Sequence, residues 1–135
     1  MNRFLVFVLA LLILLSCTKE QDVFLKNPEL IGKWKLIEQL ADPGDGSGTF
    51  MPVESYRTVE FFKNGKVVSN GSLCDFSSSS DNYSEGIFND VKQTIRTTSC
   101  ENEGSEIIYE LKNSELIFYY LCIEGCAQKF EKISN

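Results

Sequence analysis

The chain has 135 residues, a formal net charge of −6 at pH 7 and no histidine. An acidic chain is a poor partner for nucleic acid, and the lack of histidine removes the commonest general base and the commonest metal ligand. No phosphate-binding loop or G-x-S-x-G motif is present. We therefore expect no nucleic-acid partner, no enzymatic activity, no cofactor and no metal.

The first 16 residues have the pattern of a secretory signal peptide. Arg3 precedes an apolar run of 12 residues over 4–15, which is shorter than the roughly 20 residues that cross a bilayer. The run ends in Leu14-Leu15-Ser16-Cys17, which resembles the lipobox of bacterial lipoproteins. The resemblance implies that Cys17 is acylated and anchors the mature chain in the cell envelope. An ordinary signal peptide with a stray cysteine and a short amino-terminal anchor are the alternatives.

No Asp follows Cys17, so resemblance to common lipoprotein sorting implies delivery to the outer membrane. The mature chain, residues 17–135, has the length of one domain. Its first part, 17–27, is polar and is expected to be a flexible tether. Cleavage removes only Arg3 among the charged residues, leaving 12 basic residues beside all 19 acidic ones. Because the sequence of the mature chain has no polybasic patch, membrane attachment is expected to depend on the acyl chains alone.

The domain begins with one helical turn at Asn27-Pro28-Glu29-Leu30, where Asn is a favoured cap and Pro a favoured first helical residue. A strand over 34–40 follows Gly32. Residues 42–57 contain three glycines and two prolines and predict a long loop. Strands over 58–63 and 66–70 flank Asn64-Gly65, a pair typical of a two-residue hairpin turn with positive φ at both residues.

Five further strands are predicted in the second half of the chain. They cover residues 83–89, 93–99, 106–111, 115–122 and 127–133. Ser77–Ser80 forms a polar loop before them, and Asn113-Ser114 is the turn between the third and fourth of them. Ile123-Glu124-Gly125 reads as a three-residue hairpin loop with Gly in the left-handed conformation. The pattern predicts an all-β protein, an eight-stranded antiparallel up-and-down meander that closes into a barrel over 28–135.

Four cysteines remain beside Cys17, at positions 74, 100, 122 and 126. In an exported chain this even number predicts two disulfides, with a tetrathiolate zinc site or free thiols as alternatives. Spacing alone does not choose among three pairings. In an up-and-down barrel, however, the four thiols fall at one mouth, and neighbouring loops favour the pairs Cys74–Cys100 and Cys122–Cys126 over the crossed alternatives.

Gly32-Lys33-Trp34, which opens the first strand after a helical turn, resembles the G-x-W motif of lipocalins. The segments 64–74 and 122–130 are similar to parts of bacterial lipocalin-like lipoproteins. The resemblance implies that Trp34 plugs the closed end of the barrel. Two family features are absent: the long helix after the last strand, and the Arg that stacks on the Trp, for which only Lys129 and Lys132 are available.

Alternation along the strands predicts which side chains face the interior. These side chains either pack the core or line a cavity for a small ligand. The candidate ligand-binding residues are Leu36, Glu38, Phe61, Tyr109, Phe118 and Tyr120. Glu38 is a carboxylate on an apolar inward face and needs a partner, for which Arg96 and Arg57 are candidates. A shift of one residue in the register would place Glu38 outside.

Two functions are consistent with these features. The first is a monomeric, membrane-anchored lipocalin-like lipoprotein that binds a small apolar or amphipathic ligand. The second is an interaction module or an inhibitor of a basic enzyme that uses the loops 42–57 and Ser77–Ser80. Asp42 and Asp45 read as a solvated turn, with calcium binding as the alternative.

Overall fold

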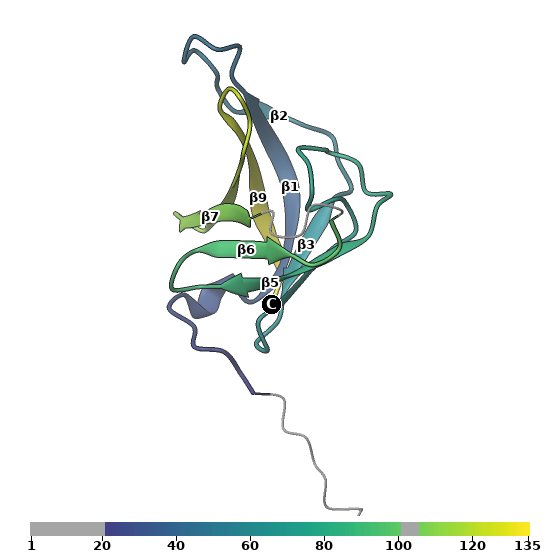
Figure 1. The fold of residues 1–135 in the computed structure, drawn as a ribbon, viewed down its shortest axis with the longest axis vertical. Coiled ribbons are helices and arrows are strands. Elements are labelled where there is room, and N and C mark those ends of the chain that lie inside the picture. Colours follow the sequence, from purple (N-terminus) through teal and green to yellow (C-terminus); the bar gives the residue numbers. More distant parts are fainter. Residues whose placement is uncertain (1–20, 101–105) are drawn as a thin grey trace, which may run out of the picture.

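The computed structural model describes residues 21–100 and 106–135, which form nine antiparallel strands in one sheet (Figure 1). The neighbour order is β2-β1-β3-β4-β5-β6-β7-β8-β9, and β1 also pairs with β9, so the sheet closes. The elements are η1 (Pro28–Leu30), β1 (Gly32–Ala41), β2 (Met51–Pro52), β3 (Thr58–Phe61), β4 (Lys66–Ser69), β5 (Ser84–Asn89), β6 (Thr94–Thr97), β7 (Glu106–Lys112), β8 (Glu115–Tyr120) and β9 (Cys126–Ser134).

The predicted eight-stranded barrel is confirmed by β1 and β3–β9. Each predicted strand is present, with ends that differ by at most two residues from the expected bounds. The expectation of an unbroken loop over 42–57 is wrong, because β2 pairs with β1 through Glu38↔Pro52 and Gln39↔Met51. β2 and β3 thus share one edge of the long strand β1, and β9 occupies the other edge.

The turn at Asn64-Gly65 differs in type from the prediction. Phe62 N donates to Lys66 O at 2.9 Å, Gly65 N donates to Phe62 O at 3.0 Å, and only Gly65 has a positive φ, +87°. This is a type I turn followed by a bulge, which needs one left-handed residue instead of two. The β7–β8 turn is the one with two left-handed residues, Asn113 at +53° and Ser114 at +64°.

The hairpin loop before β9 is also different from the expectation. It covers residues 121–125, because β8 ends at Tyr120, and Gly125 does not have a positive φ. Gly125 O accepts a hydrogen bond from Asp42 N at 2.8 Å. The loop is therefore held by the neighbouring 42–48 loop and by its disulfide, and it does not need a left-handed glycine.

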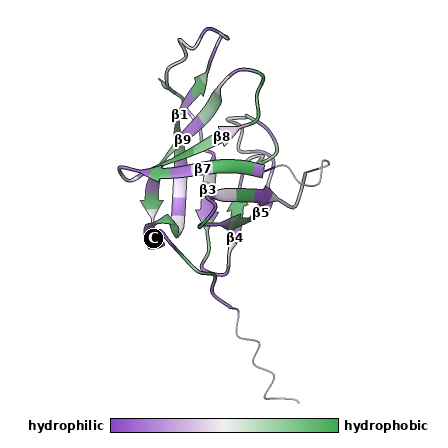
Figure 2. Ribbon diagram, turned by 60° about the vertical axis from the view of Figure 1, so that its left-hand side comes forward, coloured by the Kyte–Doolittle hydropathy of each residue, from purple (hydrophilic) through white to green (hydrophobic). Residues whose placement is uncertain are grey.

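Alternation of polar and apolar residues along the strands is visible in Figure 2, and the inward side chains fill the barrel. Phe61 lies at the centre of an aromatic cluster, with its ring centroid 5.1 Å from Phe88, 5.9 Å from Tyr109 and 6.4 Å from Phe118. Phe130 packs on Phe118 at 4.8 Å. Eight strands enclose just enough space for side chains, so this interior is a packed core.

Trp34 is buried at the end of the barrel where β1 begins, which we call the closed end. Its indole Nε1 donates to Leu30 O at 2.9 Å, so η1 covers this end. The Lys132 ammonium lies 5.6 Å from the centre of the Trp34 ring. Lys132 thus supplies a cation over the ring of Trp34.

The predicted tether is shorter than residues 17–27. Val23 N donates to Lys63 O at 2.9 Å, and Val23 and Leu25 pack against the core. Asn27 binds the buried Asp90 through its backbone N at 2.6 Å and its side-chain amide at 3.1 Å. Residues 23–27 therefore belong to the folded domain.

Candidate functional site

The mouth of the barrel, where β1, β4, β6 and β8 end, is closed by two disulfides. Cys74 is bonded to Cys100 with a Cα–Cα distance of 5.6 Å, and Cys122 to Cys126 with 6.0 Å. The predicted pairing and the predicted gathering of the four cysteines at one mouth are both confirmed. The first bridge links the β4–β5 and β6–β7 connections, and the second closes the β8–β9 hairpin loop.

Arg57 is a completely buried cation just inside the mouth. Its Nη1 donates to Gln128 Oε1 at 2.8 Å and to Ser77 O, and its Nη2 donates to Ser72 O at 2.5 Å and to Tyr120 Oη at 3.1 Å. No carboxylate within residues 21–100 and 106–135 forms an ion pair with it. Arg57 thus joins the 70–83 loop, β8 and β9 through neutral acceptors.

Tyr120 connects this network to the surface. Its hydroxyl donates to Gln128 Oε1 at 2.7 Å, and its ring packs edge-on against Phe76 with centroids 5.8 Å apart. Burial raises the pKa of Tyr120 above its ordinary value, and the Arg57 guanidinium partly offsets that rise. Tyr120 therefore stays a neutral phenol at physiological pH, with one face turned toward the mouth.

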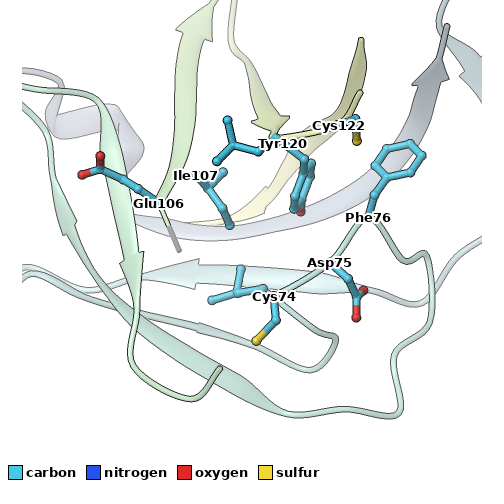
Figure 3. Close-up of a pocket in the computed structure, with 9 residues that line it drawn as sticks. Cys74, Asp75, Phe76, Glu106, Ile107, Tyr120 and Cys122 are labelled. Atoms are coloured by element: carbon cyan, nitrogen blue, oxygen red, sulfur yellow. The ribbon is translucent and has the colours of Figure 1, made fainter. Parts of the chain in front are cut away.

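A pocket of about 300 Å³ opens between the two disulfides (Figure 3). Its apolar floor includes Ile107 and Tyr120, and Asp75 and Glu106 line its edges, with the Glu106 carboxylate directed away from the other lining side chains. The lining residues are Leu73, Cys74, Asp75, Phe76, Glu106, Ile107, Tyr120, Leu121 and Cys122. We call this the mouth pocket. It has an apolar floor and an acidic rim, with no lysine or arginine among its lining residues.

Most of the predicted ligand-binding residues lie deeper than this pocket. Phe61, Tyr109 and Phe118 are buried in the aromatic core, and Tyr109 Oη donates to Asp90 Oδ1 at 2.9 Å. Leu36 is buried and also borders a hollow of about 470 Å³ on the wall beside residues 53–56. Of the six predicted residues, Tyr120 alone lines the mouth pocket.

Glu38 does not pair with Arg57 or Arg96, so that prediction is wrong. Its carboxylate binds Lys129 Nζ at 2.7 Å, and Lys129 also lies 3.8 Å from Glu115. The pairing of β1 with β9 shifts between Leu36 and Glu38, which leaves Ile37 as a bulge. A bulge moves the following side chain to the other face, so Glu38 stands opposite the outward Lys129, whereas Leu36 stands opposite the inward Phe130.

The carboxylates of Asp42 and Asp45 accept hydrogen bonds from backbone groups within the long loop. The Asp42 carboxylate accepts hydrogen bonds from the backbone N of Gly44, Gly46 and Gly48 at 2.7–3.0 Å, and these bonds lower its pKa. Asp45 does the same for Ser47 N at 2.9 Å. In the described part of the chain, no group of three or more His, Cys, Asp or Glu side chains is placed to hold a metal ion.

Cys17, the predicted lipidation site, lies outside the described residues. Within 21–100 and 106–135, no helix is long and apolar enough to cross a membrane. Comparison with protein-family models, curated proteins and solved structures found no match. The functional argument therefore depends on the site geometry and on the amino-terminal sequence.

Sequence reasoning missed Arg57, Asp75 and Phe76 as parts of the mouth. A signal for Arg57 is present in the sequence, because it is the single basic residue in the connections 42–57 and 70–83, which otherwise carry only acidic charges. A lone cation among acidic loops is a candidate for burial in a polar network. Asp75 and Phe76 offer no comparable signal, since their contribution depends on how the loop after Cys74 folds over the barrel.

Proposed function

We propose that this protein is a lipid-anchored, lipocalin-like lipoprotein of the cell envelope that binds a small amphipathic ligand in the mouth pocket. The observation that carries the proposal is an open pocket of about 300 Å³ above a barrel interior filled by side chains. This volume is at the lower end for small-molecule sites. The ligand is therefore expected to sit at the rim, above the aromatic cluster.

The proposed anchor depends on Leu14-Leu15-Ser16-Cys17 after the short apolar run. Growth with an alkyne fatty acid should label the wild-type protein and leave Cys17→Ala unlabelled. Cys74→Ala is a control that also removes one cysteine, and it should keep the label. Label that persists in Cys17→Ala would refute the anchor. Recovery of wild-type protein in the inner-membrane fraction would refute the outer-membrane assignment.

The chemistry of the mouth pocket favours a ligand with an apolar body and a cationic group. Leu73, Phe76, Ile107 and Tyr120 supply apolar contact, and carboxylates at the edges attract a positive charge and repel a negative one. The cation of Arg57 does not line the pocket, and both of its terminal nitrogens already bind protein acceptors. A fatty-acid carboxylate would therefore lack a basic partner there.

Calorimetric titration with hexylammonium and with hexanoate tests this chemistry, because the two probes share an apolar chain and differ in charge. We expect hexylammonium to bind and hexanoate to bind at least about tenfold more weakly. Asp75→Asn with Glu106→Gln should reduce the preference, whereas Asp81→Asn, a control elsewhere in the 70–83 loop, should keep it. Equal binding of the two probes would refute the proposed ligand class, and so would a failure of both probes to bind.

A second function is favoured by the hairpin loop after β8. Leu121 and Ile123 are 91% and 105% exposed on a loop that the Cys122–Cys126 disulfide closes, and Glu124 lies between the cysteines. Exposed aliphatic tips on a constrained acidic loop suit contact with a basic protein partner. A pull-down against cationic enzymes discriminates the two functions: Leu121→Ser with Ile123→Ser should abolish capture, and Asp75→Asn should leave it intact.

A further inference from the structure

The two ends of the barrel differ in charge, although the chain as a whole is acidic. The described mouth connections, 42–57, 70–83, 98–100 and 121–125, contain six carboxylates and one cation, the buried Arg57. The closed-end connections, 21–31, 62–65, 90–93 and 113–114, contain three lysines and three carboxylates. The connections at the closed end are therefore less acidic than those at the mouth.

Each of these three lysines lies in a closed-end connection, and two of those connections also carry an apolar side chain that is more than half exposed. The closed-end patch consists of Phe24, Lys26, Lys63, Val91 and Lys92. Phe24 is 78% and Val91 is 60% exposed, and the three lysines are exposed as well. Within residues 21–100 and 106–135, no carboxylate forms an ion pair with these lysines.

Hydrogen bonds hold the three segments of the patch together. Val23 N donates to Lys63 O at 2.9 Å, and Asn27 N donates to Asp90 Oδ2 at 2.6 Å. The 21–31 segment is thus attached to both the β3–β4 and the β5–β6 turns, and Figure 1 shows these parts together at the end of the molecule opposite the β1–β2 loop. The segments that carry Phe24, Lys26, Lys63, Val91 and Lys92 are therefore held at the same end of the barrel.

The chain length before this patch limits where an anchor at Cys17 can lie. Val23 is six residues after Cys17 and is hydrogen-bonded to the barrel. Six residues span at most about 20 Å when fully extended. The mouth lies at the far end of β1, a ten-residue strand that is itself about 33 Å long. An anchor at Cys17 thus keeps the closed end nearer to the bilayer than the mouth.

We propose that the closed-end patch rests on an anionic membrane surface, so that the mouth pocket faces away from the bilayer. The proposal rests on the lipid anchor put forward above. Lysines are attracted to anionic headgroups, and exposed apolar side chains insert between them. Asp22 and Glu29 are exposed in the same connections, so the patch is weakly basic. The acidic mouth, which such a surface repels, adds to the preference for one orientation.

Fluorescence quenching on vesicles tests the orientation. The full-length lipoprotein is reconstituted into phosphatidylcholine vesicles that contain about 30% phosphatidylglycerol, an anionic lipid that makes the surface potential negative. The vesicles also carry a headgroup-attached quencher. One fluorophore is placed at the closed end through Glu29→Cys or at the mouth through Asp45→Cys, each of which removes one exposed carboxylate. We expect the closed-end label to be quenched at least about threefold more than the mouth label.

The role of the patch is tested separately from that of the tether. Lys63→Glu should reduce the difference between the two labels, whereas Lys35→Glu, the same charge change on the barrel wall, should preserve it. Equal quenching of both labels, or stronger quenching of the mouth label, would overturn the orientation while leaving the anchor standing. A difference that Lys63→Glu does not change would overturn the patch. Protein that fails to bind the vesicles at all would overturn the anchor and the orientation together.

Discussion

The closed end and the mouth of this barrel are held together by different kinds of interaction. At the closed end, Trp34 and Leu30 are fully buried, and the β3–β4, β5–β6 and β7–β8 turns are short. At the mouth, long polar connections meet over Arg57, Gln128 and two disulfides. Apolar burial fixes one end, and covalent bonds with a buried polar network fix the other.

The difference follows from what the loops contain. The connection 70–83 has five serines and few large apolar side chains, so it cannot bury enough apolar surface to order itself. A cross-link and a buried guanidinium order such a loop without a hydrophobic core. The same arrangement leaves space between the loops, and this is where the mouth pocket lies.

Replacement of Trp34 should have the largest effect on stability. Trp34→Ala removes a buried indole and its hydrogen bond to Leu30 O, so we expect a loss of about 3–5 kcal/mol in the free energy of unfolding. Denaturant titration followed by circular dichroism measures the change. A loss below about 1 kcal/mol would show that the closed end is not held by this side chain.

The two disulfides should contribute unequally. Cys74→Ser with Cys100→Ser opens a loop with a sequence separation of 26, and we expect a loss of about 3–4 kcal/mol. Cys122→Ser with Cys126→Ser opens one with a separation of 4, and about 2 kcal/mol is expected. Denaturant midpoints of the two double variants give the comparison. The reverse order would contradict the assignment of the longer bridge as the main constraint on the mouth.

Arg57 should matter more than an ordinary surface arginine. Arg57→Met leaves Ser72 O without its donor and weakens the contacts to Ser77 and Gln128, so about 2–3 kcal/mol of stability should be lost. Arg96→Met, on the exposed face of β6, is the control and should change stability by less than about 0.5 kcal/mol. Equal effects would mean that the polar network does not hold the mouth.

Tyr109 should make the barrel sensitive to alkali. Burial raises the pKa of Tyr109 far above its ordinary value of 10.0, with the nearby Asp90 carboxylate adding to the rise. Since the folded-state pKa is raised, the stability that the protonated phenol contributes is full below pH 10 and is lost as the pH rises above it. Tyr109→Phe should lose about 1–2 kcal/mol at pH 7.

Tyr109→Phe should also lose stability less steeply between pH 9 and 11 than the wild type, as thermal melting at each pH would show. Tyr56→Phe is the control, because Tyr56 is 85% exposed and should leave the slope unchanged. The same slope in Tyr109→Phe and the wild type would contradict the titration argument.

Glu38 should have the smallest effect. Its ion pair with Lys129 is partly exposed to solvent, and Glu38→Gln should cost less than about 1 kcal/mol. Chemical denaturation at low and high salt checks this value. A loss above about 2 kcal/mol would indicate that the Glu38 carboxylate is buried. It would support the inward position that the strand alternation predicts.

The fold was largely predictable because its signals are local. Period-two alternation, the Gly-rich breaks and the G-x-W start predicted all eight barrel strands, and strand order favoured the two disulfide pairs that the structure has. Turn type was less predictable. Asn64-Gly65 permits a two-residue turn, but the barrel uses one left-handed residue there and two at Asn113-Ser114.

The candidate site was less predictable because a one-residue bulge turns the next side chain of the strand to the opposite face of the sheet. Ile37 carries no mark of a bulge in the sequence, yet it moves Glu38 from the predicted interior to the surface. The free volume inside a barrel likewise depends on the sizes of many side chains together, and here the aromatic cluster fills it. The proposed ligand site therefore lies among the mouth loops and not in the predicted interior. The sequence pattern did not specify how those loops fold.

The most direct test of the central claim is to locate the ligand by NMR. Titration of hexylammonium into isotopically labelled protein should shift the backbone amide signals of Leu73, Ile107 and Tyr120 at the mouth. The amides of Phe61 and Phe88, in the filled interior, should change little. Shifts concentrated at Phe61 and Phe88, or no shifts at the mouth, would contradict a ligand site above a packed barrel.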